Sequence, residues 1–280
     1  MKKLSPAAYL PLLRAALRED LGSGGDVTTR YFISARERFK ARVVSRESGV
    51  VCGLDVAAAV FRACDRGARV RALVRDGARV RPGQAVLQVS GGRGLLTAER
   101  TALNFLQRLS GVATLTRRYV DLVRGTRARI LDTRKTLPGW RALDKYAVVC
   151  GGGLNHRMGL YDAAMVKDNH YLGKRLAEGA RALRGARPGV PLIVECDTPA
   201  QATRALALKP DVLLLDNMAP ALLKSEIARL RRLAPRIKLE ISGGVSLKTV
   251  RALARLGPDR ISIGRLTHSA PALDLGLDLA

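Results

Sequence analysis

Six short apolar segments in the second half of the chain constrain its fold more than any other feature. Each ends in a polar residue and is followed by a helix-compatible stretch of ten or more residues. The segments are ARILDT, AAMVKD, PLIVECD, DVLLLDN, IKLEISG and DRISIGR. This alternation predicts a parallel β/α array, and strands that are apolar almost throughout are typical of a sheet buried on both faces.

Polar residues and glycines gather at the carboxyl ends of these predicted strands, where β/α barrels carry their chemistry. They are Asp132, Arg134, Lys135, Lys167, Asp168, Glu195, Asp216, Ser242, Gly243, Gly244 and Gly264. Cations, carboxylates and a glycine-rich turn on one rim together describe a site for a phosphorylated, metal-bound substrate.

The first hundred or so residues mix helical and extended patterns. The predicted elements are helices over 9–20 and 54–64 and strands over 39–45, 69–74 and 85–89. Turn signals at Asp76-Gly77, Pro82-Gly83 and Gly91-Gly92 predict hairpins, and therefore an antiparallel sheet with helices beside it. A long helix predicted over 95–123 leads into the second domain.

The formal net charge of +25 directs attention to anionic partners, either nucleic acid or small anionic substrates. Basic residues are scattered through every segment rather than gathered in one arm or helix, and arginine far outnumbers lysine. This distribution indicates a compositional bias of the whole protein. We therefore expect no nucleic-acid partner.

Targeting signals and cysteine usage both favour a cytoplasmic protein. The opening MKK precedes an apolar stretch that charged residues soon interrupt, so we expect an amphipathic helix there rather than a signal peptide. No apolar run approaches the roughly 18 to 20 residues that span a bilayer, so we expect no membrane partner. Cys52, Cys64, Cys150 and Cys196 lie far apart without CxxC or zinc-site spacing, which predicts reduced thiols.

The most specific motif is ILDTRKTLPGWRALDKYAVVCGGGLNHRMGLYDAAMVKDNH, at residues 130–170. Further motifs occur in order: EDLGSGGDVTT at 19–29, ERTALNFLQRLSG at 99–111, VE at 194–195, LLDN at 214–217, SGG at 242–244 and IGRLTHS at 263–269. With these motifs nearly the whole chain resembles the quinolinate phosphoribosyltransferase family. A lone GGG or TRK would be weak evidence, whereas an ordered series across the chain is specific.

The resemblance implies a fold and an activity. The fold would be that of a type II phosphoribosyltransferase, an α/β protein with an N-terminal α+β sandwich domain at 1–110 and an incomplete β/α barrel at 111–266. The tail at 267–280 would return to the first domain. The activity would be phosphoribosyl transfer from phosphoribosyl pyrophosphate to quinolinate with decarboxylation, giving nicotinate mononucleotide, pyrophosphate and carbon dioxide in de novo NAD biosynthesis.

The resemblance also implies Mg²⁺ as cofactor, no organic cofactor, and a homodimer or higher homo-oligomer with sites shared between subunits. Quinolinate is a dicarboxylate, and the planar fork of arginine suits a carboxylate better than a point charge does. The implied carboxylate-binding residues are Arg100, Arg134, Arg157 and Lys167, with His156 beside them. For a single arginine in so basic a chain the alternative is a solvated surface charge.

Glu195 and Asp216 are the implied magnesium ligands, directly or through water, and Lys135 is the implied pyrophosphate cation. With Lys167 these residues make up the catalytic set. The alternative for the two carboxylates is an N-cap or first-turn acid of the following helix. The remaining implied substrate-binding residues are Thr133, Ser242, Gly243, Gly244, Ile263, Gly264 and Arg265. For the SGG motif the alternative is an ordinary tight turn.

Two rival functions stay open at this point. One is another enzyme of the same architecture, a nicotinate phosphoribosyltransferase or a molybdenum-associated relative, which would need fewer cations for a monocarboxylate. The other is a basic nucleic-acid-binding protein with an inactive barrel, which a salt titration of DNA binding would reveal. The sequence departs from the family pattern at the GSGGD loop, which is one residue longer, and at Cys196, where an aliphatic residue is expected.

Overall fold

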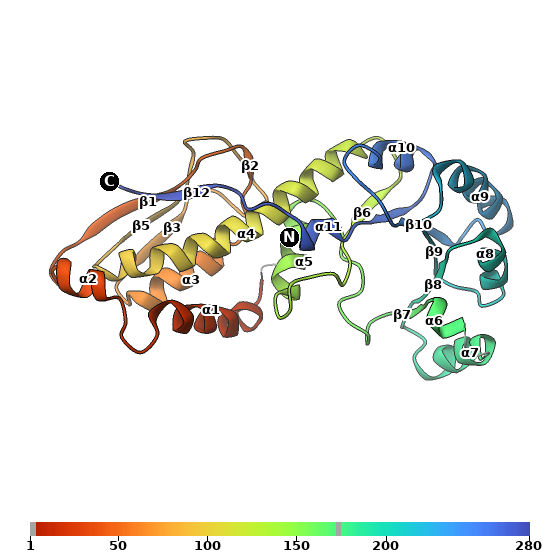
Figure 1. The fold of residues 1–280 in the computed structure, drawn as a ribbon, viewed down its shortest axis with the longest axis horizontal. Coiled ribbons are helices and arrows are strands. Elements are labelled where there is room, and N and C mark those ends of the chain that lie inside the picture. The colour runs from red at the N-terminus through yellow and green to blue at the C-terminus, as the bar shows by residue number, and fades with distance from the viewer. Residues whose placement is uncertain (1–3, 172–174) are drawn as a thin grey trace. The chain divides into compact units, whose positions relative to one another are not determined.

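The computed structural model describes residues 4–171 and 175–280, which form two compact units (Figure 1). The first unit takes in the chain up to Arg117, together with Thr136–Gly152 and Arg265–Ala280. The second unit takes in Arg118–Lys135 and Gly153–Gly264.

An antiparallel sheet and its helices make up the first unit. Its helices are α1 (Pro6–Leu21), α2 (Val27–Phe32), α3 (Leu54–Cys64), most of α4 (Gly94–Leu122), α5 (Arg141–Cys150) and α11 (Arg265–His268). Its strands are β1 (Phe39–Ser45), β2 (Gly49–Val50), β3 (Arg69–Ala72), β4 (Arg79–Val80), β5 (Ala85–Gly91) and β12 (Leu275–Leu279). The main sheet has the order β12-β1-β5-β3, and β2 pairs separately with β4. The predicted α+β domain is confirmed.

The two predicted strands on either side of the Asp76-Gly77 and Pro82-Gly83 signals, now β3 and β5, pair antiparallel as expected, but a further short strand, β4, lies between them in the chain. The Asp76-Gly77 turn leads from β3 to β4, yet β4 pairs with β2 and β3 pairs with β5. The Gly91-Gly92 pair ends β5 and leads into α4. Turn residues set where the chain reverses, but strand partners follow from which faces the sheet buries.

A parallel sheet with helices makes up the second unit. Its strands are β6 (Arg129–Leu131), β7 (Ala164–Val166), β8 (Leu192–Cys196), β9 (Val212–Asp216), β10 (Lys238–Ser242) and β11 (Arg260–Ser262). Its helices are α6 (Asp168–Tyr171), α7 (Leu176–Ala186), α8 (Pro199–Leu206), α9 (Pro220–Leu233) and α10 (Val250–Arg255). All six predicted strands are present.

The strand order of this sheet is β6-β11-β10-β9-β8-β7. The first strand pairs with the last, and among the described residues only the pairing of β6 with β7 is lacking from a closed ring. The incomplete β/α barrel is therefore confirmed.

A short segment links the two edge strands across this opening. Leu154 forms a parallel bridge with Leu131, and its N–H donates to the Ile130 carbonyl at 2.8 Å. Three residues later, the Arg157 guanidinium donates to the Ala163 carbonyl next to β7 at 3.1 Å. Segment 154–157 therefore places its backbone and the Arg157 guanidinium group in the opening between β6 and β7.

Apolar packing supports each unit. In the barrel, Ala163, Ile193, Val212 and Leu214 form a buried cluster against which Met165 packs. In the first unit, Phe105 of α4 stacks on Trp140 with ring centroids 5.0 Å apart. Burying a large apolar side chain contributes roughly 1.5 to 3 kcal/mol, so these contacts fix the strands and helices that carry the polar residues.

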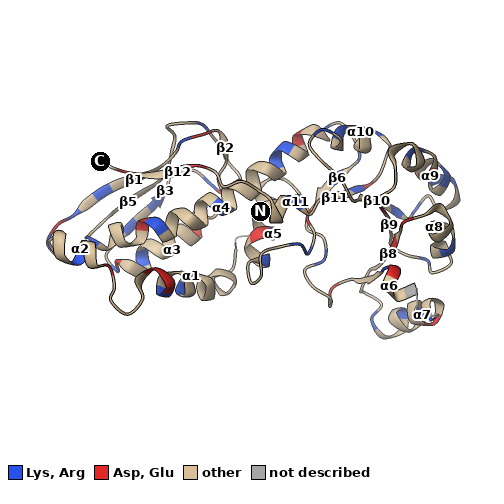
Figure 2. Cartoon of the chain, in the orientation of Figure 1, with Lys and Arg blue, Asp and Glu red and all other residues tan. Residues whose placement is uncertain are grey.

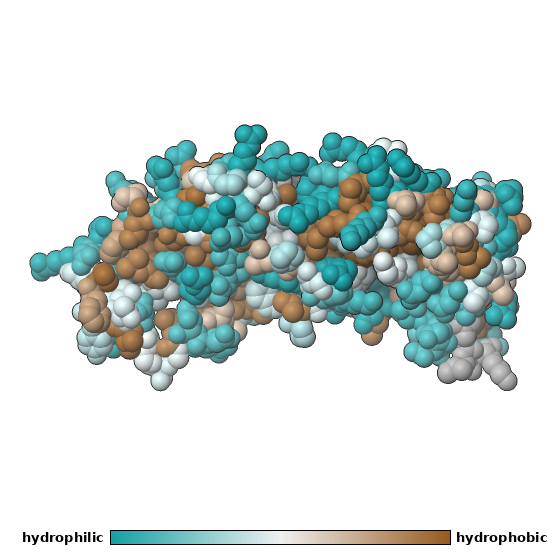
Figure 3. Space-filling view, turned by 45° about the horizontal axis from the view of Figure 1, so that its top comes forward, coloured by the Kyte–Doolittle hydropathy of each residue, from teal (hydrophilic) through white to brown (hydrophobic). Residues whose placement is uncertain are grey.

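The chain is rich in lysine and arginine, which are spread over both units (Figure 2). Figure 2 shows lysines and arginines on helices and strands of both units, without one dominant cluster. The face seen in Figure 3 is largely hydrophilic, with separate hydrophobic patches. Over residues 4–171 and 175–280, the structure contains no helix with the length and apolar character that a membrane crossing requires.

Candidate active site

The register of the parallel strands sets the polar residues on one face. Glu195 of β8 pairs with Leu214 of β9, and Leu214 pairs with Glu240 of β10. Asp216 and Ser242 pair with each other two residues further along. Alternate residues of a strand point to the same face, so all five side chains share one face of the sheet. Because Leu214 belongs to the buried barrel cluster, that face is the barrel interior.

The carboxyl ends of β7 and β8 bring a cation and a carboxylate together. The Lys167 ammonium lies 2.7 Å from Glu195 Oε2, with side chains 40% and 15% exposed. The Lys167 N–H donates to His170 Nδ1 at 3.1 Å. Two residues predicted to handle substrate and metal are therefore in direct contact.

Neither Glu195 nor Asp216 caps a helix. Helix α8 is capped by Thr198, which forms a reciprocal capping box with Gln201. Helix α9 follows Ala219 as its N-cap residue. The helix-cap alternative for the two carboxylates is therefore wrong, and Glu195 instead pairs with Lys167.

The SGG turn after β10 approaches the end of β9 closely. Gly243 and Gly244 have φ of 87° and 60°, in the left-handed region that favours glycine. A Cβ at Gly243 would overlap Asn217 Oδ1, whereas a Cβ at Gly244 would meet nothing within 4 Å. Asn217 also donates to Asp216 Oδ2 at 2.7 Å. The turn therefore packs tightly on one side and opens toward solvent on the other, where a ligand can approach its backbone.

Two half-buried arginines act on each other in this unit. Burial lowers the pKa of Arg157, and the positive charge of Arg134 lowers it further, against the opposing effect of Asp162 and Glu195. The Nε atom of Arg134 is buried and has no hydrogen-bond acceptor in the described part of the chain. Like charges held close together and away from water are costly, and an anion placed beside them lowers that cost.

A buried chain of contacts holds the backbone next to Arg157. The His156 N–H donates to Asp132 Oδ1 at 2.8 Å, and the Arg157 N–H donates to His156 Nδ1 at 2.8 Å. Because Nδ1 accepts, the ring proton of neutral His156 lies on Nε2. That atom is 3.2 Å from Glu240 Oε1, and Arg260 lies 3.9 Å from Glu240 Oε2. The imidazole therefore faces Glu240 inside the barrel.

Glu240 is a residue that the sequence reasoning missed. It is fully buried between Leu239 and Ile241, which are also buried. A carboxylate in the middle of the otherwise apolar segment IKLEISG was the available signal, since charged residues are almost never fully buried unless they are paired.

The other predicted residues have distinct surroundings. Lys135 is exposed, and its N–H donates to Thr133 Oγ1 at 3.0 Å. The side chain of Ile263 is buried, and its N–H donates to a carbonyl of β6 at 2.9 Å. Arg100 and Arg265 are both exposed and belong to the first unit, whereas every other predicted site residue belongs to the second.

Both halves of the chain match one protein family. Residues 26–110 match the N-terminal domain and residues 112–278 the C-terminal domain of quinolinate phosphoribosyl transferase. The chain is 47% identical to nicotinate-nucleotide pyrophosphorylase [carboxylating] of Mycobacterium leprae, over 95% of each protein. It is 36% identical to quinolinate phosphoribosyltransferase [decarboxylating] 2a of Nicotiana tabacum, over 96% of this chain and 81% of the relative.

A solved structure agrees with these matches. The nicotinate-nucleotide pyrophosphorylase of Francisella tularensis superposes with a TM-score of 0.92 at 34% identity, over 99% of this chain and 98% of that one. Two matched domains, relatives along almost the full length and a shared fold all agree with the ordered motifs. The chain belongs to the quinolinate phosphoribosyltransferase family.

Proposed function

We propose that this protein transfers the phosphoribosyl group of phosphoribosyl pyrophosphate to the pyridine nitrogen of quinolinate and releases one carboxylate as carbon dioxide. The products are nicotinate mononucleotide, pyrophosphate and carbon dioxide, a step of de novo NAD biosynthesis. The observation that carries the choice of substrate is that Arg134 and Arg157 are both half-buried in the second unit, with the Nε atom of Arg134 buried and lacking a hydrogen-bond acceptor among the described residues. A dicarboxylate can neutralise two guanidinium groups, whereas the single carboxylate of nicotinate neutralises one.

Each carboxylate of quinolinate is assigned to cations at the barrel rim. Arg134 and Arg157 bind through their planar forks, and Lys167 supplies a point charge. His156 acts mainly on Arg157, because its Nδ1 accepts the Arg157 N–H while its Nε2 faces Glu240. Glu240 is then a positioning residue that keeps the imidazole, and through it the Arg157 backbone, in place.

We assign Mg²⁺ to Glu195 and Asp216. Both carboxylates point into the barrel from neighbouring strands, two positions apart in register. Asp216 Oδ2 accepts from Asn217 at 2.7 Å, and Oδ1 has no hydrogen bond within the described residues. A magnesium site built from one or two carboxylates, waters and substrate phosphate oxygens fits this donor set. When bound, the ion would neutralise charge that develops on the leaving pyrophosphate.

The protein's own residues supply the remaining steps. Lys135 is assigned to the pyrophosphate, and the turn at 242–244 with Gly264 to the 5′-phosphate, because late barrel loops with approachable amides bind phosphate. The pyridine nitrogen forms a bond to the anomeric carbon as the bond to pyrophosphate breaks. The positive charge of the resulting pyridinium stabilises the electron pair that stays on the adjacent ring carbon as the bond to the carboxylate breaks and carbon dioxide leaves. A proton from solvent then adds to that carbon, so no organic cofactor is required. Positioning and charge neutralisation account for most of the rate enhancement.

The active unit in this proposal is at least a homodimer, with Arg100 of one subunit serving the site of the other. Exposed apolar side chains that lie close together in the sequence support an interface, because monomers rarely expose large contiguous apolar patches. Val27, Tyr31 and Phe32 of α2 are 60%, 76% and 82% exposed, and Leu160 and Tyr161 are 73% and 68% exposed. The proposed compartment is the cytoplasm, where thiols such as these stay reduced.

An assay with two substrates side by side tests the function. Carbon dioxide and pyrophosphate should be released when quinolinate, phosphoribosyl pyrophosphate and magnesium are all present, and not when one of the three is left out. Replacing quinolinate with nicotinate should reduce pyrophosphate release strongly. Equal turnover of the two pyridines, or no turnover of quinolinate, would refute the proposal. A salt titration of DNA binding in parallel tests the nucleic-acid alternative.

A further inference from the structure

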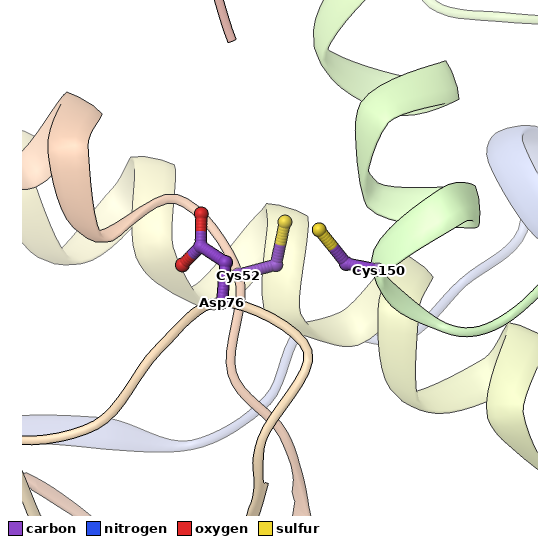
Figure 4. Close-up of side chains that lie close together, drawn as sticks. All are labelled: Cys52, Asp76 and Cys150. Carbon is purple, nitrogen blue, oxygen red and sulfur yellow. The ribbon is translucent and has the colours of Figure 1, made fainter. Parts of the chain in front are cut away.

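Two cysteines and an aspartate from distant parts of the sequence meet in the first unit (Figure 4). Cys52 precedes α3, Asp76 lies in the turn after β3, and Cys150 ends α5. Their two Sγ atoms and one carboxylate oxygen all lie within 4.8 Å of one another. Cys52 is 0% and Cys150 3% exposed. A Cβ at Gly77 would lie 3.1 Å from the Cys150 carbonyl, so the turn that carries Asp76 packs directly on the end of α5.

Hydrogen bonds fix the orientation of the Asp76 carboxylate. Its Oδ1 accepts the N–H groups of Gly53 and Leu54 at 3.0 and 3.1 Å, at the start of α3. Its Oδ2 accepts the Tyr146 hydroxyl at 2.8 Å. Such contacts are what a helix-capping aspartate makes, and they are also the outer contacts that orient a metal-ligating carboxylate. The two thiols against this carboxylate have no part in helix capping.

The charge of the Asp76 carboxylate favours a cation in this cluster. Burial raises the pKa of Asp76, and no lysine or arginine of the described chain forms an ion pair with it. Burial, with a smaller effect of Cys150, also raises the pKa of Cys52. One divalent cation that replaces two thiol protons leaves the net charge of the cluster unchanged. The cluster thereby gains metal–ligand bonds without any additional buried charge.

We propose that Cys52, Cys150 and Asp76 form a binding site for a thiolate-preferring divalent cation of the zinc class. Thiolate sulfur and carboxylate oxygen are both zinc ligands, and three protein ligands leave the fourth position of a tetrahedral site for water. Zinc–sulfur bonds of about 2.3 Å in a tetrahedron place two sulfurs about 3.8 Å apart, so small side-chain movements complete the site. Binding is written as M²⁺ plus two thiols giving the dithiolate complex and two protons.

The site differs from the one assigned to magnesium. Sulfur ligands select zinc-like ions, whereas the carboxylates of the barrel suit magnesium. A cavity of about 610 Å³, lined by Asp76, Tyr146, Asp55 and Leu54 among others, gives the cation a route to the carboxylate side of the cluster. Occupancy would tie the end of α5 to the segments at Cys52 and Asp76.

Cobalt(II) is the probe, because thiolate-to-cobalt charge transfer absorbs in the near ultraviolet. The reduced wild-type protein should develop this band with one Co²⁺ per chain, zinc should abolish it, and excess Mg²⁺ should leave it unchanged. Since two protons leave, the apparent affinity should rise by up to about a hundredfold per pH unit below the thiol pKa values. Absence of the band from the wild-type protein overturns the proposal without any variant.

Cysteine-to-serine variants test which thiols bind the metal. Cys52→Ser and Cys150→Ser should each lose the band, whereas Cys64→Ser, which alters a cysteine outside the cluster, should keep it. A band that survives both cluster substitutions, or that depends on Cys64, refutes the assignment. If a cluster variant does not fold, the wild-type stoichiometry, zinc competition and pH dependence still decide the question. None of these measurements depends on enzymatic activity, so the outcome is separate from that of the proposed function.

Discussion

Replacing Arg134 with lysine tests the proposed substrate site most directly. The substitution keeps the positive charge near Arg157 but removes the second prong of the fork and the buried Nε donor, which has no acceptor in the described protein. A hydrogen bond to a charged group contributes about 1.5 to 3 kcal/mol, and one such contact is lost. Each 1.4 kcal/mol corresponds to a factor of ten, so kcat/KM for quinolinate should fall about ten- to a hundredfold.

The assay is steady-state pyrophosphate release with quinolinate varied at saturating phosphoribosyl pyrophosphate. Arg232→Lys is the matched control, since Arg232 is an exposed residue in the last turn of α9 and its substitution should leave kcat/KM within about twofold of the wild type. Thermal unfolding should show that both variants are folded. An Arg134→Lys protein with wild-type efficiency would mean that Arg134 does not bind a carboxylate and that the argument from the paired guanidinium groups fails.

Three further outcomes are expected. Glu240→Gln should lower quinolinate kcat/KM about fivefold or more, because it removes the negative charge 3.2 Å from His156 Nε2. The ring ¹⁵N shifts of His156 should move with it, and unchanged shifts would contradict the positioning role. Arg100→Ala and Lys135→Ala, each nearly inactive alone, should regain activity in about a quarter of all sites after refolding together, and no recovery despite subunit exchange would exclude a shared site. Burial of Asp259 opposes ionisation, but hydrogen bonds from Leu239 and Arg231 outweigh it and lower its pKa. Its stabilisation is therefore present above about pH 4 and lost as the pH falls through the folded-state pKa. Asp259→Asn should lower Tm near pH 7, and the difference in Tm should shrink as the pH falls below about 4; a difference that does not shrink would refute this.

The barrel could be predicted from sequence because its signal is repeated and local. Each strand is a short apolar run that ends in a polar residue, and parallel strands place those ends on one rim. Lys167 and Glu195 were predicted as site residues for this reason, in agreement with the family motifs, and they lie in contact at 2.7 Å. The helical period over α4 was equally informative.

Features that depend on distant partners could not be predicted. The pairing of β2 with β4 involves two residues on each strand, too few to show a period. In the sequence, Glu240 is a single polar residue in an apolar strand. Its contact with His156 depends on the folded barrel, which brings the two residues to 3.2 Å. The spacing of the cysteines argued against a zinc site, yet the fold brings Cys52 and Cys150 together across 98 residues of chain. Spacing rules detect sites built from neighbouring residues, and this cluster comes from three separate segments.

The sheet of the first unit has a consequence for biosynthesis. Strand β12 at Leu275–Leu279 forms the edge next to β1, whose own residues are Phe39–Ser45. During translation, β1 and β5 can pair early, but one side of β1 keeps unpaired N–H and C=O groups until residues 275–279 leave the ribosome. At about 5 to 20 residues per second, that interval lasts at least ten seconds or so. An unpaired strand edge is a template for association with other chains, so nascent chains should depend on chaperones until β12 has docked.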